Sequence, residues 1–465
     1  GGGGEARGGG AEGGGMEGAG SRGLARRVAP LALLGFLVNC KPSEAFLARF
    51  LSEGRGLSEA QLDSAVWPAF AYASLALLLP IGFLADAWGC RRVVALGLGA
   101  RLATRLVLAL APPGLGWAVL AEIFFAAASA CDPVFFAYVF QVVPEADYPR
   151  AAAAVGAAFH AGNVLGSLLG QGLVWGVSLE GPGLVLLFYV SLAFSALGAL
   201  CLGYFPEELT PPPPSVFSLA RGPGGVRAAA REVRELYLGG PGAPATQAWS
   251  LFWLFGMAAS LIVLNYYQTQ LYVIDPATPF GFAEAAMEAA AVVGALGPCT
   301  SGLQEYLGRP AWFLIATAVL EGALYLGTLA GRRGVWPALV CNCLAIGLFF
   351  VLYTAAQAAI AANLQRKRFS IVLAANTFGA LVLLSVAQAA AGWAGLRTSG
   401  YYCVAAGLQA TLALSIGLHA WLRGLRGRGR ALYEQMPERL TAEAFDGCSL
   451  DESAEQGCGG GGGGI

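Results

Sequence analysis

Long apolar stretches, separated by short polar turns, recur along most of the 465-residue chain. A helix needs about 20 predominantly apolar residues to cross the hydrocarbon core of a bilayer, and it satisfies its own backbone hydrogen bonds there. Turn signals divide the chain into twelve such stretches, at 28–51, 63–85, 92–112, 115–143, 150–176, 181–205, 246–273, 279–304, 310–331, 335–362, 369–393 and 399–422. The sequence therefore predicts an all-α membrane protein with twelve transmembrane helices.

The composition agrees with a lipid-facing surface. Charged residues make up 12% of the chain and hydrophobic residues 56%, with a mean hydropathy of +0.61. Soluble domains usually contain about 25% charged residues. The formal net charge is −1, so the chain has no excess of positive charge that would indicate a nucleic-acid partner. We expect the lipid bilayer itself to be the surrounding medium.

Polar segments divide the chain into five parts. They are a Gly-rich disordered cytoplasmic tail at 1–27, a six-helix bundle at 28–205, a cytoplasmic central loop at 206–245, a second six-helix bundle at 246–423, and a cytoplasmic tail at 424–465. Two bundles of six spans around a polar linker are typical of transporters with internal repeats.

Arginine and lysine residues are concentrated in alternate loops. With the N-terminus inside, the outer loops contain only Arg55, Arg332, Arg333 and Arg397, and the remaining basic loop residues face the cytoplasm. Positive loop charge sets membrane orientation. We therefore expect both termini to be cytoplasmic, and we favour the plasma membrane as the location.

The residues needed for several kinds of chemistry are scarce. Lys41 and Lys367 are the only lysines, neither lies in a phosphate-binding G-x-x-x-x-G-K motif, and His160 and His419 are the only histidines. No nucleophile, base and oxyanion set is visible. The sequence predicts no enzyme activity, no cofactor and no metal site.

A charged motif follows the second predicted span. Residues 82–92 read GFLADAWGCRR, in which Gly82, Asp86, Gly89, Arg91 and Arg92 resemble the G-x-L-A-D-x-x-G-x-R-R signature of the major facilitator superfamily. The glycines permit a tight turn, and the aspartate can bond a helix N-terminus or an arginine. The resemblance implies a structural or gating role, whereas an ordinary cytoplasmic turn is the simpler alternative.

Four further segments resemble the reduced folate carrier and thiamine transporter family. They are KPSEAFL at 41–47, WSLFW at 249–253, LNYYQ at 264–268 and ANTF at 375–378. The resemblance implies a vitamin transporter that works by alternating access around a cavity between two bundles. A non-transporting membrane sensor or scaffold on the same frame remains an alternative.

The resemblance favours a thiamine-type substrate over a folate-type one. Asp132 stands where folate carriers have an arginine and thiamine transporters a glutamate, and Ile346 and Leu384 occupy two other cationic positions of folate carriers. We therefore expect a small organic cation, most plausibly thiamine. A reduced folate or another anionic vitamin stays open, provided that Arg101 and Arg105 face the cavity.

Family matches also suggest the substrate-binding residues. Glu44, Asn265 and Glu288 match polar positions of thiamine transporters. Phe70 replaces a tryptophan and Phe135 a tyrosine, so each keeps a ring face but loses cation–π strength or a hydroxyl.

The residues themselves support part of this assignment. Asp132 and Phe135 are three residues apart in one predicted span, so an acid and a ring share a helix face suited to an organic cation. The alternative for Asp132 is a structural ion pair with Arg101 or Arg105.

Glu44 follows Pro42, which breaks a helix locally, and broken helices often line substrate sites. Its alternative is a pair with Lys41 or Arg49.

The fifth and eighth predicted spans also contain polar and small residues. Glu284 and Glu288 are four residues apart, and if they share a proton, that proton could be exchanged against the substrate. Protons are therefore one candidate for the coupled ion, and a counter-transported anion is the other. His160 is expected to be a hydrogen-bonded packing residue, and the small residues between Gly162 and Gly172 predict close helix packing.

Overall fold

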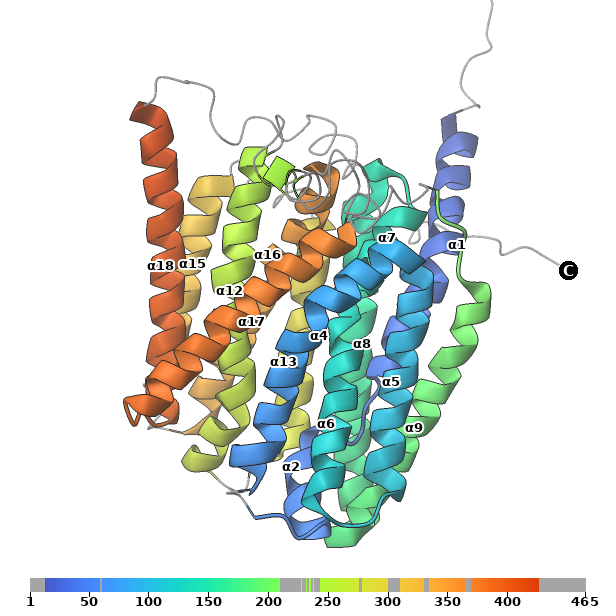
Figure 1. The fold of residues 1–465 in the computed structure, drawn as a ribbon, viewed down its shortest axis with the longest axis vertical. Helices are drawn as coiled ribbons and strands as arrows, with labels where there is room; N and C mark the ends of the chain where they lie inside the picture. The colour runs from blue at the N-terminus through green and yellow to red at the C-terminus, as the bar shows by residue number, and fades with distance from the viewer. Residues whose placement is uncertain are drawn as a thin grey trace, which may run out of the picture.

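The computed structural model describes residues 13–58, 61–209, 243–275, 278–299, 310–329, 334–363 and 369–425, with single positions 227, 231, 234, 235 and 237 between them. Every regular element in these ranges is helical (Figure 1). The α-helices are α1 (Gly13–Asn39), α2 (Leu47–Arg49), α4 (Trp67–Trp88), α5 (Cys90–Leu110), α6 (Leu115–Ala130), α7 (Asp132–Val142), α8 (Tyr148–Gly176), α9 (Val185–Leu200), α12 (Ala243–Ile274), α13 (Phe280–Leu296), α15 (Pro310–Leu329), α16 (Val335–Asn363), α17 (Phe369–Trp393) and α18 (Thr398–Leu425).

The helices follow the predicted apolar stretches closely. Eleven helical stretches, some of which join an α-helix to an adjoining helix or turn, are long and apolar enough to cross a membrane, and each overlaps one predicted span. The remaining predicted span, 279–304, contains α13, whose 17 residues are continued by a 3₁₀ turn at Gly297–Cys299. The all-α architecture is confirmed within the described residues.

Helix α1 begins earlier than expected. Residues 13–27 were predicted to belong to a disordered tail, but α1 starts at Gly13. Leu24, Ala25, Arg26 and Arg27 are good helix formers that continue directly into the apolar span, so the helix extends back beyond the membrane segment. The Arg27 guanidinium also donates to the Val142 carbonyl oxygen at 3.3 Å, which ties this turn to α7.

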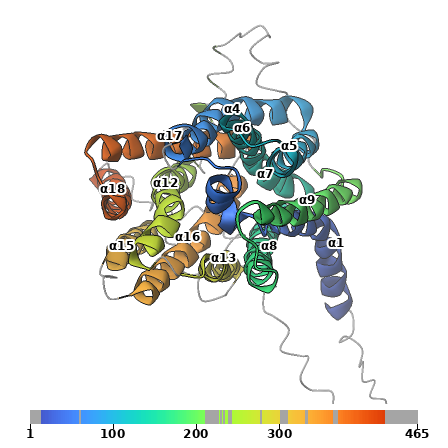
Figure 2. The same cartoon turned by 90° about the horizontal axis from the view of Figure 1, so that it is seen from below.

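The helices group on two sides of the molecule. Figure 2 shows α12, α15, α16 and α18 on one side and α1, α5, α6 and α9 on the other. Extensive contacts of α8 with α13 and of α4 with α17 join the two sides. Helix α1 begins and α18 ends at the same end of the bundle (Figure 1).

The first apolar span is broken near its middle. Helix α1 ends at Asn39, and a 3₁₀ turn at Glu44–Phe46 follows Pro42. The Ser43 amide donates to the Ser191 hydroxyl oxygen at 3.2 Å, which satisfies a buried backbone group that the break leaves without a helical partner. The predicted local break at Pro42 is confirmed, and it turns the following residues toward the interior.

Three glycines of α8 make room for this broken segment. A Cβ at Gly162 would lie 2.2 Å from the Phe36 carbonyl oxygen, and one at Gly166 would lie 2.4 Å from the Lys41 backbone nitrogen. A Cβ at Gly170 would lie 2.4 Å from the Pro42 carbonyl oxygen. The close packing predicted for this stretch is confirmed.

The fourth predicted span is also interrupted. Helix α6 ends at Ala130 and α7 begins at Asp132, with Pro133 in its first turn. This places the Asp132 carboxylate at a helix N-terminus, where the helix dipole and free amides stabilise negative charge. The Cys131 Cβ lies 2.6 Å from where a Cβ at Gly97 would stand, so α5 approaches the break through a glycine.

The motif at 82–92 forms the turn between α4 and α5. Gly89 has φ of +90° and donates its amide to the Ala85 carbonyl oxygen at 2.9 Å, a helix-ending conformation that favours glycine. Arg91 donates to the Leu202 carbonyl oxygen at 3.1 Å, and Arg92 donates to the Trp88 carbonyl oxygen at 3.3 Å. The tight turn is therefore present, and both arginines bind backbone carbonyls.

An aromatic triad joins the two sides of the molecule. The rings of Phe140 (α7) and Tyr148 (α8) have centroids 5.0 Å apart, and each lies 5.9 Å from the Phe369 ring (α17). All three side chains are fully buried. They form a dry contact where α7 ends and where α8 and α17 begin.

The glycine contacts give a stability prediction. Gly166→Ala should lower the free energy of unfolding by about 1–3 kcal/mol, because the new methyl meets backbone that cannot rotate away. The melting temperature of the purified protein measures this. Gly172→Ala is the matched control, since its Cβ would meet nothing within 4 Å on the same helix. Equal melting temperatures for the two variants would contradict the packing argument.

Candidate substrate site

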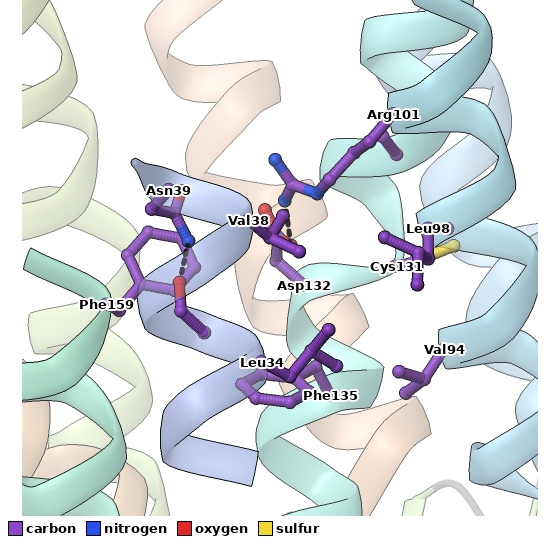
Figure 3. Close-up of a pocket in the computed structure, with 13 residues that line it drawn as sticks. Leu34, Val38, Asn39, Val94, Leu98, Arg101, Cys131, Asp132, Phe135 and Phe159 are labelled. Carbon is purple, nitrogen blue, oxygen red and sulfur yellow. Dashed lines mark hydrogen bonds and ion pairs between the residues drawn. The ribbon is translucent and has the colours of Figure 1, made fainter. Parts of the chain in front are cut away.

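A small open pocket lies among α1, α5, α6, α7 and α8 (Figure 3). Its wall is mostly apolar, formed by Leu34, Gly35, Val38, Val94, Gly97, Leu98, Ala128, Cys131, Phe135 and Phe159, with Asn39, Arg101 and Asp132 as its polar members. A mostly apolar wall with few polar groups is typical of small-molecule sites. The sequence placed Asp132 and Phe135 on one face, and both line this pocket.

The Asp132 carboxylate forms an ion pair with Arg101. An Arg101 Nη2 hydrogen donates to Asp132 Oδ1, and Figure 3 shows the two side chains pointing toward one another. This is one of the two pairings left open for Asp132 by the sequence. The side chain of Asp132 is 33% exposed, whereas that of Arg101 is 7% exposed. The carboxylate is therefore paired and still reachable from the pocket.

Arg105 lies one helical turn beyond Arg101, and no carboxylate among the described residues is bonded to it. It donates to the Arg101 carbonyl oxygen at 3.2 Å and to the Val38 carbonyl oxygen at 3.4 Å. Its Nε–H is buried without a partner, and the residue is 4% exposed. The charged groups that act on this guanidinium are Arg101 and Glu44.

Glu44 also has a basic partner. Lys41 Nζ lies 3.3 Å from Glu44 Oε2, the local pairing that the sequence left open. The Glu44 side chain is 35% exposed, and it acts electrostatically on the buried Glu122. Arg49, the other candidate partner, binds Glu53 at 2.9 Å instead.

The aromatic position Phe70 connects to this pair through Phe125. The two rings have centroids 5.3 Å apart, and Lys41 Nζ lies 5.9 Å from the Phe125 centroid. Phe70 is outside the wall of the pocket that holds Asp132 and Phe135. The predicted ring residues therefore accompany two different ion pairs.

The third acid–base pair crosses between the two sides. His160 Nδ1 of α8 lies 2.6 Å from Glu288 Oε2 of α13, and the His160 ring packs edge-on against Phe350 at 4.0 Å. His160 is hydrogen-bonded and packed, as predicted, but its partner is a predicted site residue. Glu284, one turn from Glu288, is half-buried, and its Oε2 is buried without a hydrogen-bond partner.

The other residues considered from the sequence lie outside the pocket that holds Asp132. Asn265 of α12 is exposed, and no described contact joins it to the pocket that holds Asp132. Ile346 and Leu384, which replace cationic positions of folate carriers, are buried in apolar clusters. These two positions therefore place no positive charge at the centre.

Sequence reasoning missed how Lys41, Arg101 and His160 would be used. Each was expected only as an alternative partner or a packing residue, yet Lys41 and Arg101 form ion pairs with predicted site carboxylates and His160 is hydrogen-bonded to Glu288. A basic residue inside an apolar span is costly unless it has a partner or a water-filled cavity. That cost is the signal that could have added these residues to the site.

Comparisons with known proteins agree with the residues quoted above. The family model for the reduced folate carrier matches residues 25–217 and 226–398. Thiamine transporter 2 of Mus musculus is 27% identical over 408 residues, covering 77% of this chain and 81% of that protein. The reduced folate transporter of Homo sapiens is 28% identical over 398 residues, covering 77% of this chain and 65% of that protein.

Solved structures show the same fold. The major facilitator superfamily proton:xylose symporter XylE superimposes with a TM-score of 0.60 at 14% identity, covering 86% of this chain and 96% of that one. The human organic anion transporter MFSD10 gives a TM-score of 0.54 at 17% identity, covering 84% of this chain and 99% of that one. The fold is that of the major facilitator superfamily, and the chain belongs to the reduced folate carrier family.

Proposed function

We propose that this protein is a vitamin transporter that moves thiamine, or a closely similar organic cation, across a membrane by alternating access. The observation that carries the proposal is the Asp132 carboxylate, whose side chain is one-third exposed in a mostly apolar pocket that the Phe135 ring also lines. An acid next to an aromatic face suits an organic cation. Relatives named as thiamine transporters support the choice.

The proposal assigns twelve spans to the chain, with α13 as the eighth. The two bundles would be 28–205 and 246–423, with 206–245 as the linker between them. Both termini would be cytoplasmic in the plasma membrane. The start of α1 and the end of α18 at one end of the bundle support a common side for the termini.

Six residues are proposed to bind the substrate. Asp132 and Phe135 would hold the cation in the pocket, while Glu44 and Phe70 would line an approach beside the Lys41 pair. Glu288 would add negative charge from α13, and Asn265 would contribute a hydrogen bond once the two bundles close on the substrate. Transport needs no covalent chemistry and no nucleotide.

An anionic vitamin is the second candidate, because one observation favours it. Arg101 lines the pocket, and Arg105 lies one helical turn further along α5. A folate-type carboxylate could meet these guanidinium groups if it displaced Asp132 from Arg101. Uptake of radiolabelled thiamine against radiolabelled folate, in a host deficient in both carriers, decides between the two candidates. Uptake of folate alone would reject the cation assignment.

The Asp132 carboxylate gives the first functional prediction. Asp132→Asn should lower thiamine uptake about ten- to a hundred-fold, since a charge-assisted contact is worth roughly 1.5–3 kcal/mol. Asp132→Glu, which keeps the charge, is the control and should retain most uptake. Surface expression is measured in parallel. Normal uptake by Asp132→Asn would reject the assignment, whereas loss of the protein from the membrane would indicate a structural ion pair.

The two phenylalanines give a second prediction. Phe135→Tyr and Phe70→Trp restore the aromatic residues of thiamine transporters, so each should keep or improve apparent thiamine affinity. The expected gain is about 0.5–1 kcal/mol for a stronger ring or one added hydroxyl. Concentration dependence of uptake measures it, with the exposed Phe282→Tyr as a control. Abolished uptake in both variants would indicate a pocket shaped for another ligand.

Energy supply gives a third prediction. A permanent cation gains about 2.3 kcal/mol per 100 mV of inside-negative potential, enough for roughly fifty-fold accumulation. If the Glu284, Glu288 and His160 group also exchanges a proton against the substrate, uptake should rise with external pH, and Glu288→Gln should flatten that rise.

Reconstituted vesicles with the voltage and pH gradients imposed separately distinguish these modes. Response to voltage alone would indicate uniport. Uptake that requires ATP after both gradients have collapsed would contradict the facilitator assignment.

A further inference from the structure

Three acid–base pairs lie at the centre of the molecule. Lys41 with Glu44, Arg101 with Asp132, and His160 with Glu288 each place an acid within ion-pair distance of a base. A site built for a simple cation would be expected to leave carboxylates unpaired and facing the ligand. This one presents both signs of charge side by side.

The wall of the pocket contains charged residues of both signs. Of the described residues that line it, two are charged, Arg101 and Asp132, and they have opposite signs. A lone cation that displaced Arg101 from Asp132 would leave the Arg101 side chain, which is 7% exposed, with a buried and unpaired charge. A lone anion bound to Arg101 would displace Asp132 in the same way.

Arg105 strengthens the positive half of the pair. It is nearly fully buried and has an unpartnered Nε–H, and its hydrogen bonds go to backbone carbonyls of Arg101 and Val38. Two guanidinium groups therefore lie one turn apart on α5, and both act electrostatically on Glu44. An acceptor group that entered beside Arg101 would lie one helical turn from the positive charge of Arg105.

The negative half has the features that a cation needs. Asp132 begins α7, lies 33% exposed, and shares the pocket with the Phe135 and Phe159 rings. A quaternary or protonated nitrogen placed there would contact a carboxylate and aromatic faces together.

We propose that the ligand preferred by this pocket carries one cationic and one anionic group, and that it inserts between Asp132 and Arg101 so that each gains a ligand partner in exchange for the other. The inference rests on the proposed transport function and names the charge class of its substrate. When an aromatic or heteroaromatic zwitterion binds in this pocket, each protein side chain that loses its ion-pair partner gains an oppositely charged group of the ligand. A purely cationic vitamin such as thiamine fills only half of this arrangement.

A matched pair of probes tests the proposal. Thiamine esterified with succinic acid at its hydroxyethyl arm is a zwitterion, and its methyl ester is a cation of nearly equal size. Both compete against labelled thiamine in uptake, and both are tested for thermal stabilisation of the full-length purified protein. The zwitterion should act at concentrations about ten- to a hundred-fold lower, the range expected for one added charge-assisted contact.

Variants connect the difference to the ion pair. Arg101→Gln should remove the advantage of the zwitterion, while Asp132→Asn should weaken both probes. If either single variant fails to reach the membrane, the neutral double variant Arg101→Gln/Asp132→Asn leaves no unpaired charge and should bind both probes weakly and equally. The exposed pair variant Arg49→Gln/Glu53→Gln is the matched control and should keep the wild-type difference.

A second probe pair separates this inference from the thiamine assignment. 4-(Aminomethyl)benzoic acid is a zwitterion without any thiamine structure, and its methyl ester is the cationic control. Absence of thiamine uptake, together with selective stabilisation by the zwitterion, would reject the thiamine assignment and keep the charge-class inference. Equal effects of acid and ester in both pairs, or an advantage that survives Arg101→Gln, would overturn the inference whether or not thiamine is transported.

Discussion

The cost of placing charge in an apolar interior governs the centre of this molecule. An ionised side chain inside a membrane span needs a partner, an aqueous cavity or both. Asp132 has both, because it binds Arg101 and remains one-third exposed to the pocket. Glu44 and Glu288 follow the same rule with Lys41 and His160. Under the charge-class proposal, a ligand that displaces one partner of an ion pair replaces it with a group of the same charge.

The charged residues reach these positions because two spans are interrupted. Pro42 ends the helical path of the first span and Pro133 opens α7, so Glu44 and Asp132 each lie at a helix start. Interrupted helices expose backbone groups that need partners in a membrane. The Ser191 hydroxyl and the glycines of α8 provide the partner and the space, so small residues far from the ligand determine where the charges stand.

Hydropathy and proline placement predicted most of the fold, because both act locally along the chain. The spans, the break at Pro42 and the turn at Gly89 follow from nearest neighbours in sequence. The choice between Arg101 and Arg105 as partner of Asp132 depends on how α5 is rotated against α7, which no local pattern contains. The pairing of His160 with Glu288 joins residues 128 positions apart and needs the packing of α8 on α13. The early start of α1 was missed because glycine-rich composition was weighted above the helix formers that follow it.

The aromatic triad of Phe140, Tyr148 and Phe369 has a consequence for how the molecule responds to temperature. If the protein works by the proposed alternating access and this buried contact separates, the three rings become hydrated. Hydration of apolar surface carries a large positive heat-capacity change, so the enthalpy of opening must itself vary with temperature. A plot of the logarithm of turnover against inverse temperature would then be curved. The curvature would increase with the ring area that becomes hydrated.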